Sequence, residues 1–423
     1  MPIKTIAWNK EKWAPLFFTI WTGQTLSWIG SAVAQFALVW WITEKTGSAT
    51  ILAVATLLSM LPGVVLGPLV GALIDRWNRR VVMLVADGII ALVSFWLAYL
   101  FWMDSLAIWH VYVIMVIRAI GGTFHWPANQ ASISLMVPKE HLPRIAGVNQ
   151  SIGGAVNIIS PPMGAFLLQI LPLHWIMMID VITALFSILP LLFIIIPQPD
   201  TAVKEEAIGS TVSAIWLDIK AGFQYIWNWK GLFWMLMIAM LVNFFTNPAM
   251  SLVPILVTSH FQGEALELGW LNASWGIGMV VGGLILGAWG GFRKRAYTIL
   301  FAILGLGLGI LMVGLAPANA LLLAIAGFFL GSAMNAIANG SAFALLQSVV
   351  APELQGRIFT VIMSMSGAIS PLSLAIGGPF ADWFGVQTLY LLAGFALILV
   401  SIAGALSPVI INLEDEQAQQ AVT

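Results

Sequence analysis

Three charged side chains interrupt long apolar stretches of the sequence, and their residue types suit proton chemistry. Arg118 lies near the middle of its stretch, while Asp87 and Asp180 each lie about one third of the way into theirs. A lone charge at the centre of a bilayer costs roughly 2.5–3.5 kcal/mol on insertion scales, so Arg118 should face a partner or a cavity. Burial and a neighbouring arginine act in opposite senses on the proton affinity of a carboxyl group. We therefore predict Asp87, Arg118 and Asp180 as proton-coupling residues, with Asp87 and Arg118 as the preferred pair.

Each of these residues also has a purely structural interpretation. Arg118 would stabilise the first half of the chain through a salt bridge or through backbone carbonyl groups. Asp180 would join two helices by hydrogen bonds, and this role is favoured for it. For Asp87 the structural and the proton-carrying roles are evenly balanced.

The apolar stretches themselves predict transmembrane helices. Only 8% of the 423 residues are charged and 60% are hydrophobic, whereas about a quarter of the residues of a soluble domain are charged. A helix of about 20 residues crosses the hydrocarbon core and satisfies its own backbone hydrogen bonds there. We expect an all-α polytopic membrane protein with twelve spans, near residues 15–42, 49–74, 81–103, 107–130, 146–170, 174–196, 231–258, 266–290, 296–316, 319–348, 357–381 and 386–410.

The lysines and arginines orient these spans, because they gather in alternate gaps between them. The positive-inside rule makes those gaps cytoplasmic, which predicts a multi-pass protein of the inner (plasma) membrane with both termini in the cytoplasm. The net charge of −1 argues against a nucleic-acid partner, and the absence of cysteine excludes disulfides and thiol chemistry. The basic gaps contain Lys4, Lys10, Lys12; Arg76, Arg79, Arg80; Lys139, Arg144; Lys204, Lys220, Lys230; Arg293, Lys294, Arg295; and Arg357.

The two halves of the chain repeat each other. Ser160-Pro161 recurs 210 residues later as Ser370-Pro371, and Arg79 recurs 216 residues later as Arg295. A parallel duplication of six helices is typical of transporters whose two halves surround a site at the membrane midplane.

The repeat predicts two six-helix bundles joined by a polar connection. Apolar residues at helical spacing from Ile215 to Trp229 fit either an amphipathic helix on the membrane surface or a solvated helix. The expected parts are an N-terminal bundle at 1–196, a cytoplasmic linker at 197–230, a C-terminal bundle at 231–411 and an acidic tail at 412–423.

The loop after the second predicted span resembles the signature loop of the major facilitator superfamily, G-x-x-x-D-R-x-x-R-R/K. It reads Gly71-Ala-Leu-Ile-Asp75-Arg76-Trp-Asn-Arg79-Arg80, with Asn78 in place of the usual glycine. The resemblance implies that Asp75 and the arginines form a gate that favours the outward-open state. Anchoring by the positive-inside rule explains Arg76, Arg79 and Arg80 without a gate, but it does not explain Asp75.

Two other segments resemble motifs of the same superfamily. Arg118-Ala-Ile-Gly121-Gly122 is similar to its fourth-helix motif, whose arginine is associated with proton transfer in proton-coupled members. Gly153-Gly154 followed by Ser160-Pro161-Pro162-Met163-Gly164 looks like a degenerate antiporter motif. Small residues and prolines permit close contact and bending, although ordinary glycine packing explains the second segment equally.

Three short segments resemble the macrolide-efflux branch of the drug:proton antiporters: Thr43 to Ala49, Phe124 to Ala128, and Pro352 to Arg357. This resemblance implies proton-driven export of amphipathic drugs such as macrolides, with a small amphipathic substrate, protons and membrane lipid as partners of a monomer. The alternatives are export of an endogenous metabolite such as a siderophore, anchored by Arg118, or a transport-dead sensor or lipid scramblase. No enzyme activity, cofactor or metal is expected, and the P-loop pattern of ATP binding is absent from the sequence.

The geometry of the superfamily directs attention to spans one, four, seven and ten as the walls of a substrate cavity. Amides and aromatic rings at mid-depth suit a bulky ligand that is mostly neutral or weakly cationic. Each amide alone also fits an ordinary hydrogen bond between helices, and His125 also fits a packing role. The candidate cavity residues are Gln24, Trp28, Gln35, His125, Asn243, Phe244, Asn247, Asn335, Asn339 and Gln347.

Overall fold

The computed structural model describes residues 8, 13–74, 76–198, 223–224, 226–227, 229–350 and 352–413. Several sequence predictions fall outside these residues. They concern Asp75 of the signature loop, positions 215–222 of the linker helix, the acidic residues of the tail, the side chain of Arg357, and Lys4, Lys10, Lys12, Lys204 and Lys220.

Twelve long helices make up most of the described chain, and each is long and apolar enough to cross a membrane. The expected all-α, twelve-span fold is therefore confirmed. The first six are α1 (Trp13–Thr46), α2 (Ala49–Ile74), α3 (Arg79–Trp102), α4 (Ile108–Met136), α5 (Leu142–Ile170) and α6 (Leu173–Phe193). The others are α8 (Lys230–Ser251), α10 (Ala265–Trp289), α11 (Arg295–Leu315), α12 (Leu321–Val349), α13 (Pro352–Phe384) and α14 (Val386–Ala405).

The described structure also contains four short helical segments with assigned bounds, and residues 223–224 and 226–227 are helical as well. The four segments are η2 (Lys139–His141), α9 (Val253–Ile255), the π-helical turn η3 (Leu256–His260) and α15 (Pro408–Ile411).

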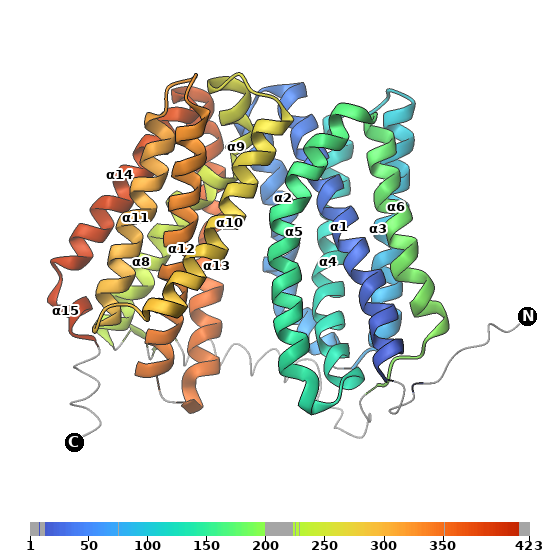
Figure 1. Ribbon diagram of the computed structural model, residues 1–423, viewed down its shortest axis with the longest axis horizontal. Helices are drawn as coiled ribbons and strands as arrows, with labels where there is room; N and C mark the ends of the chain where they lie inside the picture. Colours follow the sequence, from blue (N-terminus) through green and yellow to red (C-terminus); the bar gives the residue numbers. More distant parts are fainter. Residues whose placement is uncertain are drawn as a thin grey trace, which may run out of the picture. The chain divides into compact units, whose positions relative to one another are not determined.

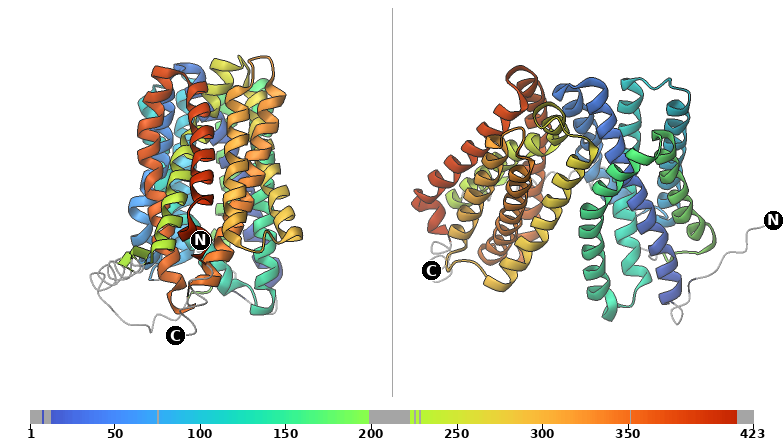
Figure 2. Two further views of the ribbon diagram at one scale, coloured as in Figure 1. Left: turned by 90° about the vertical axis from the view of Figure 1, so that its left-hand side faces the viewer. Right: turned by 45° about the horizontal axis from the view of Figure 1, so that its top comes forward.

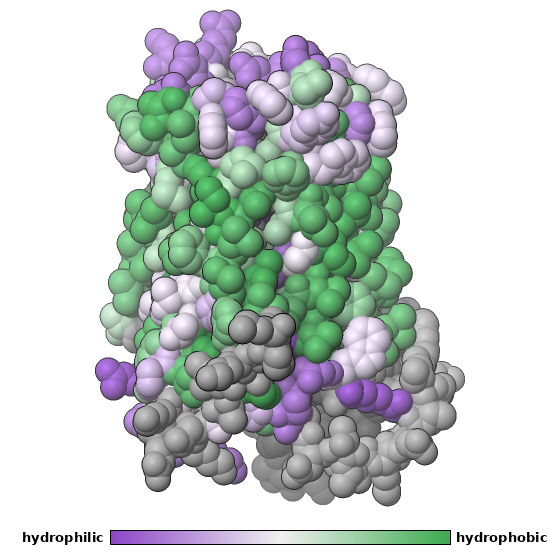
Figure 3. Space-filling view, turned by 90° about the vertical axis from the view of Figure 1, so that its right-hand side faces the viewer, coloured by the Kyte–Doolittle hydropathy of each residue, from purple (hydrophilic) through white to green (hydrophobic). Residues whose placement is uncertain are grey.

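The exterior of the helices is apolar, as a lipid environment requires. Large hydrophobic side chains such as Leu92, Trp102 and Leu322 are exposed. On the face shown in Figure 3, hydrophobic residues form a broad band across the middle, and hydrophilic residues gather at the upper end. In water such a band would drive association, whereas in a bilayer it contacts lipid tails.

Contacts between residues divide the chain into two units. Unit 1 contains Met1–Ile42 and Ala55–Val212, and unit 2 contains Thr43–Val54 and Ser213–Thr423. The corner between α1 and α2 therefore belongs to unit 2, although most of both helices belongs to unit 1. Within each unit the long helices run side by side (Figures 1 and 2).

Glycines allow the helices of unit 2 to approach one another closely. A Cβ atom added to Gly282 of α10 would collide with the carbonyl oxygen of Ala333 in α12. A Cβ atom at Gly309 of α11 would lie 2.6 Å from the carbonyl oxygen of Gly327 in α12. Lipid tails are as apolar as leucine, so packing of this kind is a main source of helix association in a membrane.

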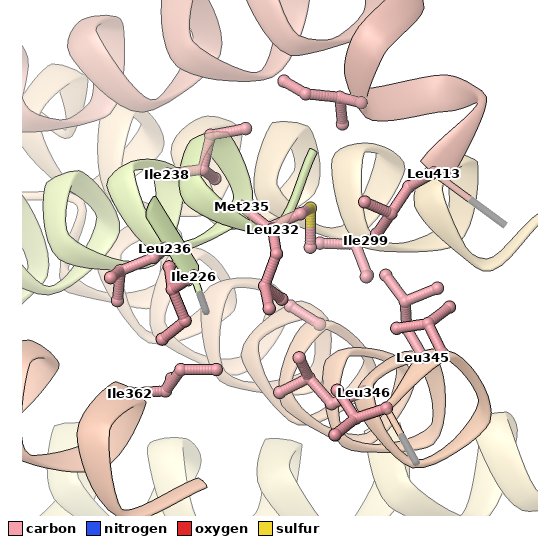
Figure 4. Packing of buried hydrophobic residues seen from close by; sticks show 14 of the residues in the cluster. Ile226, Leu232, Met235, Leu236, Ile238, Ile299, Leu345, Leu346, Ile362 and Leu413 are labelled. Carbon is pink, nitrogen blue, oxygen red and sulfur yellow. The ribbon is translucent and has the colours of Figure 1, made fainter. Parts of the chain in front are cut away.

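A cluster of buried aliphatic side chains closes one end of unit 2. Figure 4 shows Leu232, Met235 and Leu236 of α8 next to side chains from α11, α12 and α13. Leu413, which follows α15, joins the same cluster. The cluster holds the starts of α8 and α11 and the end of α12 in a fixed arrangement.

Asp382, near the end of α13, ties the α1–α2 corner to the rest of unit 2. Its carboxylate accepts hydrogen bonds from the backbone N–H groups of Ala49 (2.7 Å) and Thr50 (2.9 Å) and from the Ser48 hydroxyl (2.9 Å). The first N–H groups of a helix have no partner within the helix. A negative charge there also interacts favourably with the positive end of the helix dipole. Gly378, one turn earlier in α13, has no Cβ that would collide with Ala53 (2.7 Å).

We predict that Asp382→Asn lowers the thermal unfolding temperature of the purified protein, because the amide nitrogen that replaces one oxygen cannot accept these bonds. The loss is about 1 kcal/mol, as for other N-terminal caps. Asp104→Asn, an acid-to-amide change in the turn after α3, serves as the matched control. Equal unfolding temperatures for the two variants would contradict a stabilising role of Asp382.

Candidate functional site

Four helices of unit 1 each carry two polar residues that are seven positions apart. Seven residues are close to two helical turns, so both members of a pair lie on the same face, about 10.5 Å apart along the axis. The helices α1 and α3 run opposite to α4 and α6, so the pairs form two layers of four residues. The pairs are Gln24 and Ser31 in α1, Asp87 and Ser94 in α3, Arg118 and His125 in α4, and Asp180 and Ser187 in α6.

The first layer, which we call the ion-pair layer, consists of Arg118, Asp180, Ser31 and Ser94. Arg118 Nη1 lies 2.5 Å from Asp180 Oδ2, and the side chains are 10% and 0% exposed. Ser94 donates a hydrogen bond to the same carboxylate oxygen (2.7 Å), and Ser31 donates to Oδ1 (2.7 Å). Arg118 Nη1 also donates to Ser94 Oγ (2.5 Å). A buried carboxylate is therefore neutralised by a cation that keeps its charge at any physiological pH.

The second layer, which we call the histidine layer, consists of Asp87, His125, Gln24 and Ser187. Gln24 Nε2 (3.1 Å) and Ser187 Oγ (2.9 Å) donate hydrogen bonds to Asp87 Oδ2. His125 Nε2 lies 3.1 Å from Asp87 Oδ1, and the side chains are 18% and 6% exposed. The imidazole is a cation only when it is protonated. The cation of this layer is thus an imidazole, whereas that of the ion-pair layer is a guanidinium, which is always charged.

A cavity of about 300 Å³ opens beside the histidine layer within unit 1. The indoles of Trp28 and Trp126 face it with ring centroids 6.0 Å apart, and Trp21 Nε1 donates to Asn149 Oδ1 (2.7 Å). Gly153 of α5 leaves room for the Trp28 ring, since an added Cβ would lie 3.3 Å from it. The lining residues include Gln24, Asp87, His125, Asn129, Gln130, Asn149 and Gln150.

The helix α4 is longer than the sequence predicts. The sequence predicts that the fourth span ends at residue 130, but α4 continues to Met136. Asn129 and Gln130 face the cavity instead of ending the helix.

The structure brings Arg118 to Asp180 and not to Asp87, which corrects the preferred pair from the sequence. Arg118 and His125 share one face of α4, so the arginine lies at the level of Asp180 and the histidine at the level of Asp87. The helix-joining role favoured for Asp180 agrees with its bonds to α1, α3 and α4.

The structure also locates the candidate cavity residues. Gln24, Trp28 and His125 line the cavity of unit 1, whereas Gln35 does not. A second cavity, wholly within unit 2, is lined by Asn243, Asn247, Asn335 and Asn339. Phe244 and Gln347 line neither of these two cavities.

The arginines of the signature loop bind backbone carbonyl groups. Arg79 Nη1 donates to the Ala131 carbonyl in α4 (2.8 Å). Arg80 donates through Nε to Leu191 (2.5 Å) and through Nη2 to Leu192 (2.8 Å), near the end of α6, where carbonyl groups lack partners within the helix.

The other residues of the loop have distinct surroundings. Asn78 caps α3 by accepting from the Val81 N–H (3.3 Å), so the residue that replaces the usual glycine has a local structural role. Arg76 borders an apolar groove between α3 and α4, where Trp77 stacks on Phe124 with centroids 6.0 Å apart. A Cβ at Gly71 would meet nothing within 4 Å, so close packing does not require glycine there.

Sequence reasoning missed Ser31, Ser94 and Ser187, which complete the two layers. Their signal was the seven-residue spacing from Gln24, Asp87 and Asp180 on the same helices. It also missed Trp21 and Trp126 of the cavity, which are two among 20 tryptophans in the chain. Among the described residues, no group of three or more His, Asp or Glu side chains could hold a metal ion.

Comparisons with known proteins place this architecture in a family. The profile of the Major Facilitator Superfamily matches residues 20–259 and 232–419. Macrolide efflux protein A of Streptococcus pyogenes is 34% identical over 399 residues, which cover 93% of this chain and 96% of that protein. The multidrug efflux pump Tap of Mycolicibacterium fortuitum is 24% identical over 417 residues, covering 95% of this chain and 97% of that protein.

A solved structure supports the same fold. A bacterial homologue of the iron transporter ferroportin, in an inward-facing state, has a TM-score of 0.69 at 12% identity and covers 93% of this chain and 99% of its own. The resemblance seen in the sequence motifs is confirmed by the family profile and by the relatives that match most of the chain. The chain belongs to the Major Facilitator Superfamily and is a multi-pass membrane transporter.

Proposed function

We propose that this protein exports amphipathic, macrolide-like drugs across the inner (plasma) membrane in exchange for protons, by alternating access. Relatives named as macrolide and multidrug efflux proteins support the substrate class. The observation that carries the proposal is the contact between Asp87 and His125 at the wall of an aromatic cavity. A titratable pair that a ligand can reach is what coupling between drug and proton requires.

Asp87 is the better proton carrier of the two acids in unit 1. Asp180 has an arginine and two serines around its carboxylate, and these partners stabilise its negative charge. Its side chain is fully buried. Asp87 has only neutral hydrogen-bond donors and a histidine that is charged when protonated. Removing a proton from this layer therefore changes its charge beside the cavity, and a ligand there senses the change.

The cavity favours a neutral or cationic amphipath over an acidic metabolite. Aromatic faces and amides suit a bulky ligand, and Asp87 attracts a cationic group. Arg118 would have to anchor an acidic ligand, but its guanidinium is engaged by Asp180 and Ser94. Export of a siderophore is thus disfavoured, because its anchor has another partner.

Proton exchange supplies enough free energy for export. One proton that enters down a potential of 100 mV contributes about 2.3 kcal/mol. This energy sustains a drug gradient of roughly fiftyfold.

We predict that Asp87→Asn abolishes proton-coupled export, because the amide keeps the size of the side chain but cannot exchange a proton. Drug transport into energised inverted vesicles should fall at least about tenfold, which corresponds to about 1.4 kcal/mol. Drug-induced proton release from the purified protein should disappear in the same variant. Asp104→Asn is the control, and undiminished transport by Asp87→Asn would remove this residue from the mechanism.

The ion-pair layer should behave as structure. Arg118→Met leaves Asp180 as an unpaired buried charge, which should cost about 3–5 kcal/mol of stability. Adding Asp180→Asn removes that charge and should restore much of the lost unfolding temperature. The double variant should still release protons on drug binding. Loss of release in a stable double variant would instead place the proton on Asp180.

A susceptibility panel in a pump-deficient bacterial host tests the substrate class directly. Cells that express the wild type should tolerate higher concentrations of macrolides than cells that express Asp87→Asn, at equal protein amounts in the membrane. A panel without any protected drug would contradict drug export and favour an endogenous metabolite as substrate.

A further inference from the structure

The second cavity, in unit 2, has about 240 Å³ and a chemistry different from that of the first. None of its described lining residues carries a titratable side chain. The repeat that relates Arg79 to Arg295 spans 216 residues, and the same spacing relates Asp87 to Ile303. Ile303 lines the cavity, so an isoleucine stands where the repeat would place an acid. The polar and aromatic part of its lining is Asn243, Thr246, Asn247, Trp275, Asn335 and Asn339.

Two asparagines of this cavity have their side-chain oxygen available to a ligand. Asn243 Nδ2 donates to the backbone carbonyl of Ala239 (2.9 Å), and Asn339 Nδ2 donates to that of Asn335 (2.9 Å). A backbone carbonyl only accepts hydrogen bonds, so the NH₂ group of each amide has to face it. The Oδ1 atom is then the group that each side chain can present to a hydrogen-bond donor.

Thr246 adds a hydroxyl group that can form a hydrogen bond with a ligand. Threonines elsewhere in these helices donate to the carbonyl one turn earlier, as Thr123 does to Ala119 (2.7 Å) and Thr388 to Phe384 (2.8 Å). The Thr246 Oγ1 atom is buried and has no hydrogen-bond partner within the described part of the chain. A buried hydroxyl without a partner is unfavourable, and a ligand hydroxyl would remove that penalty.

We infer that this cavity binds an uncharged, hydroxyl-bearing part of the transported compound, such as a sugar ring or another polyol segment. The asparagine oxygens accept from its hydroxyls, Thr246 exchanges a hydrogen bond with one of them, and Trp275 provides an apolar face. An ammonium group is disfavoured, because burying it without a counter-charge is costly. This inference rests on the proposed function and names the substrate chemistry that unit 2 recognises.

The test compares two probes on the purified full-length protein. One is a macrolide with free hydroxyl groups, and the other is the same macrolide with these hydroxyls O-methylated. The wild type should bind the free form more tightly, by about fivefold for each hydrogen bond lost on methylation. Thr246→Val should weaken binding of the free form about fivefold and leave the methylated form within about twofold, while Thr246→Ser should bind both forms as the wild type does.

Stability separates recognition from a structural role. Thr246→Val removes a hydroxyl without a protein partner, so its unfolding temperature should equal or exceed that of the wild type. The Asn339→Leu variant should also lose its preference for the free form. The control is Gln387→Met, because the Gln387 amide donates to the Gly314 carbonyl away from this cavity, and this variant should keep the preference.

Two further outcomes would overturn the inference. If Thr246→Val and Asn339→Leu both kept the wild-type preference for the free over the methylated macrolide, this inference would be refuted. Macrolide export itself would not be contradicted by that result. Failure of the wild type to bind either probe would refute the inference together with macrolide export.

Discussion

A charge inside a bilayer needs a counter-charge or a polar cavity, and the interior of unit 1 is arranged around the pair that meets this need. Arg118 and Asp180 lie 2.5 Å apart, and two serine hydroxyls satisfy the carboxylate. Either residue alone would be strongly destabilising in the apolar interior. The pair therefore fixes the rotation and depth of α4 and α6, and through Ser31 and Ser94 it fixes α1 and α3 as well.

This fixed layer positions the titratable one. Two helical turns separate Arg118 from His125, Asp180 from Ser187 and Ser94 from Asp87, so the bonds of one layer set the register of the other. A histidine and an acid beside a cavity are useful for coupling only if their geometry is maintained when their charge changes. The ion pair provides that constancy, because the guanidinium remains charged throughout the physiological pH range.

The sequence predicts much of this structure, but not the pairing. The spans follow from apolar runs, and the need of Arg118 for a partner follows from its position in one of them. Which acid it meets depends on the rotation and the depth of each helix, because the levels of the two acids are only about two turns, or 10.5 Å, apart along the helix axes. The serines were missed because a hydroxyl in a helix commonly bonds its own backbone, as Ser132 does to Ala128 (2.7 Å). Only the spacing of seven on four helices together shows that they belong to one network.

The duplicated halves have diverged in their chemistry. The cavity of unit 1 is lined by an acid, a histidine and tryptophans. The cavity of unit 2 is lined by amides and a threonine, and an isoleucine stands at the repeat position of Asp87. A proton carrier in both halves would bind and release protons at two sites with separate affinities. The described lining of the cavity in unit 2 has no titratable side chain, so this cavity keeps the same charge whatever the protonation state of Asp87. Of these two cavities, only that of unit 1 therefore changes its charge in the proposed proton exchange.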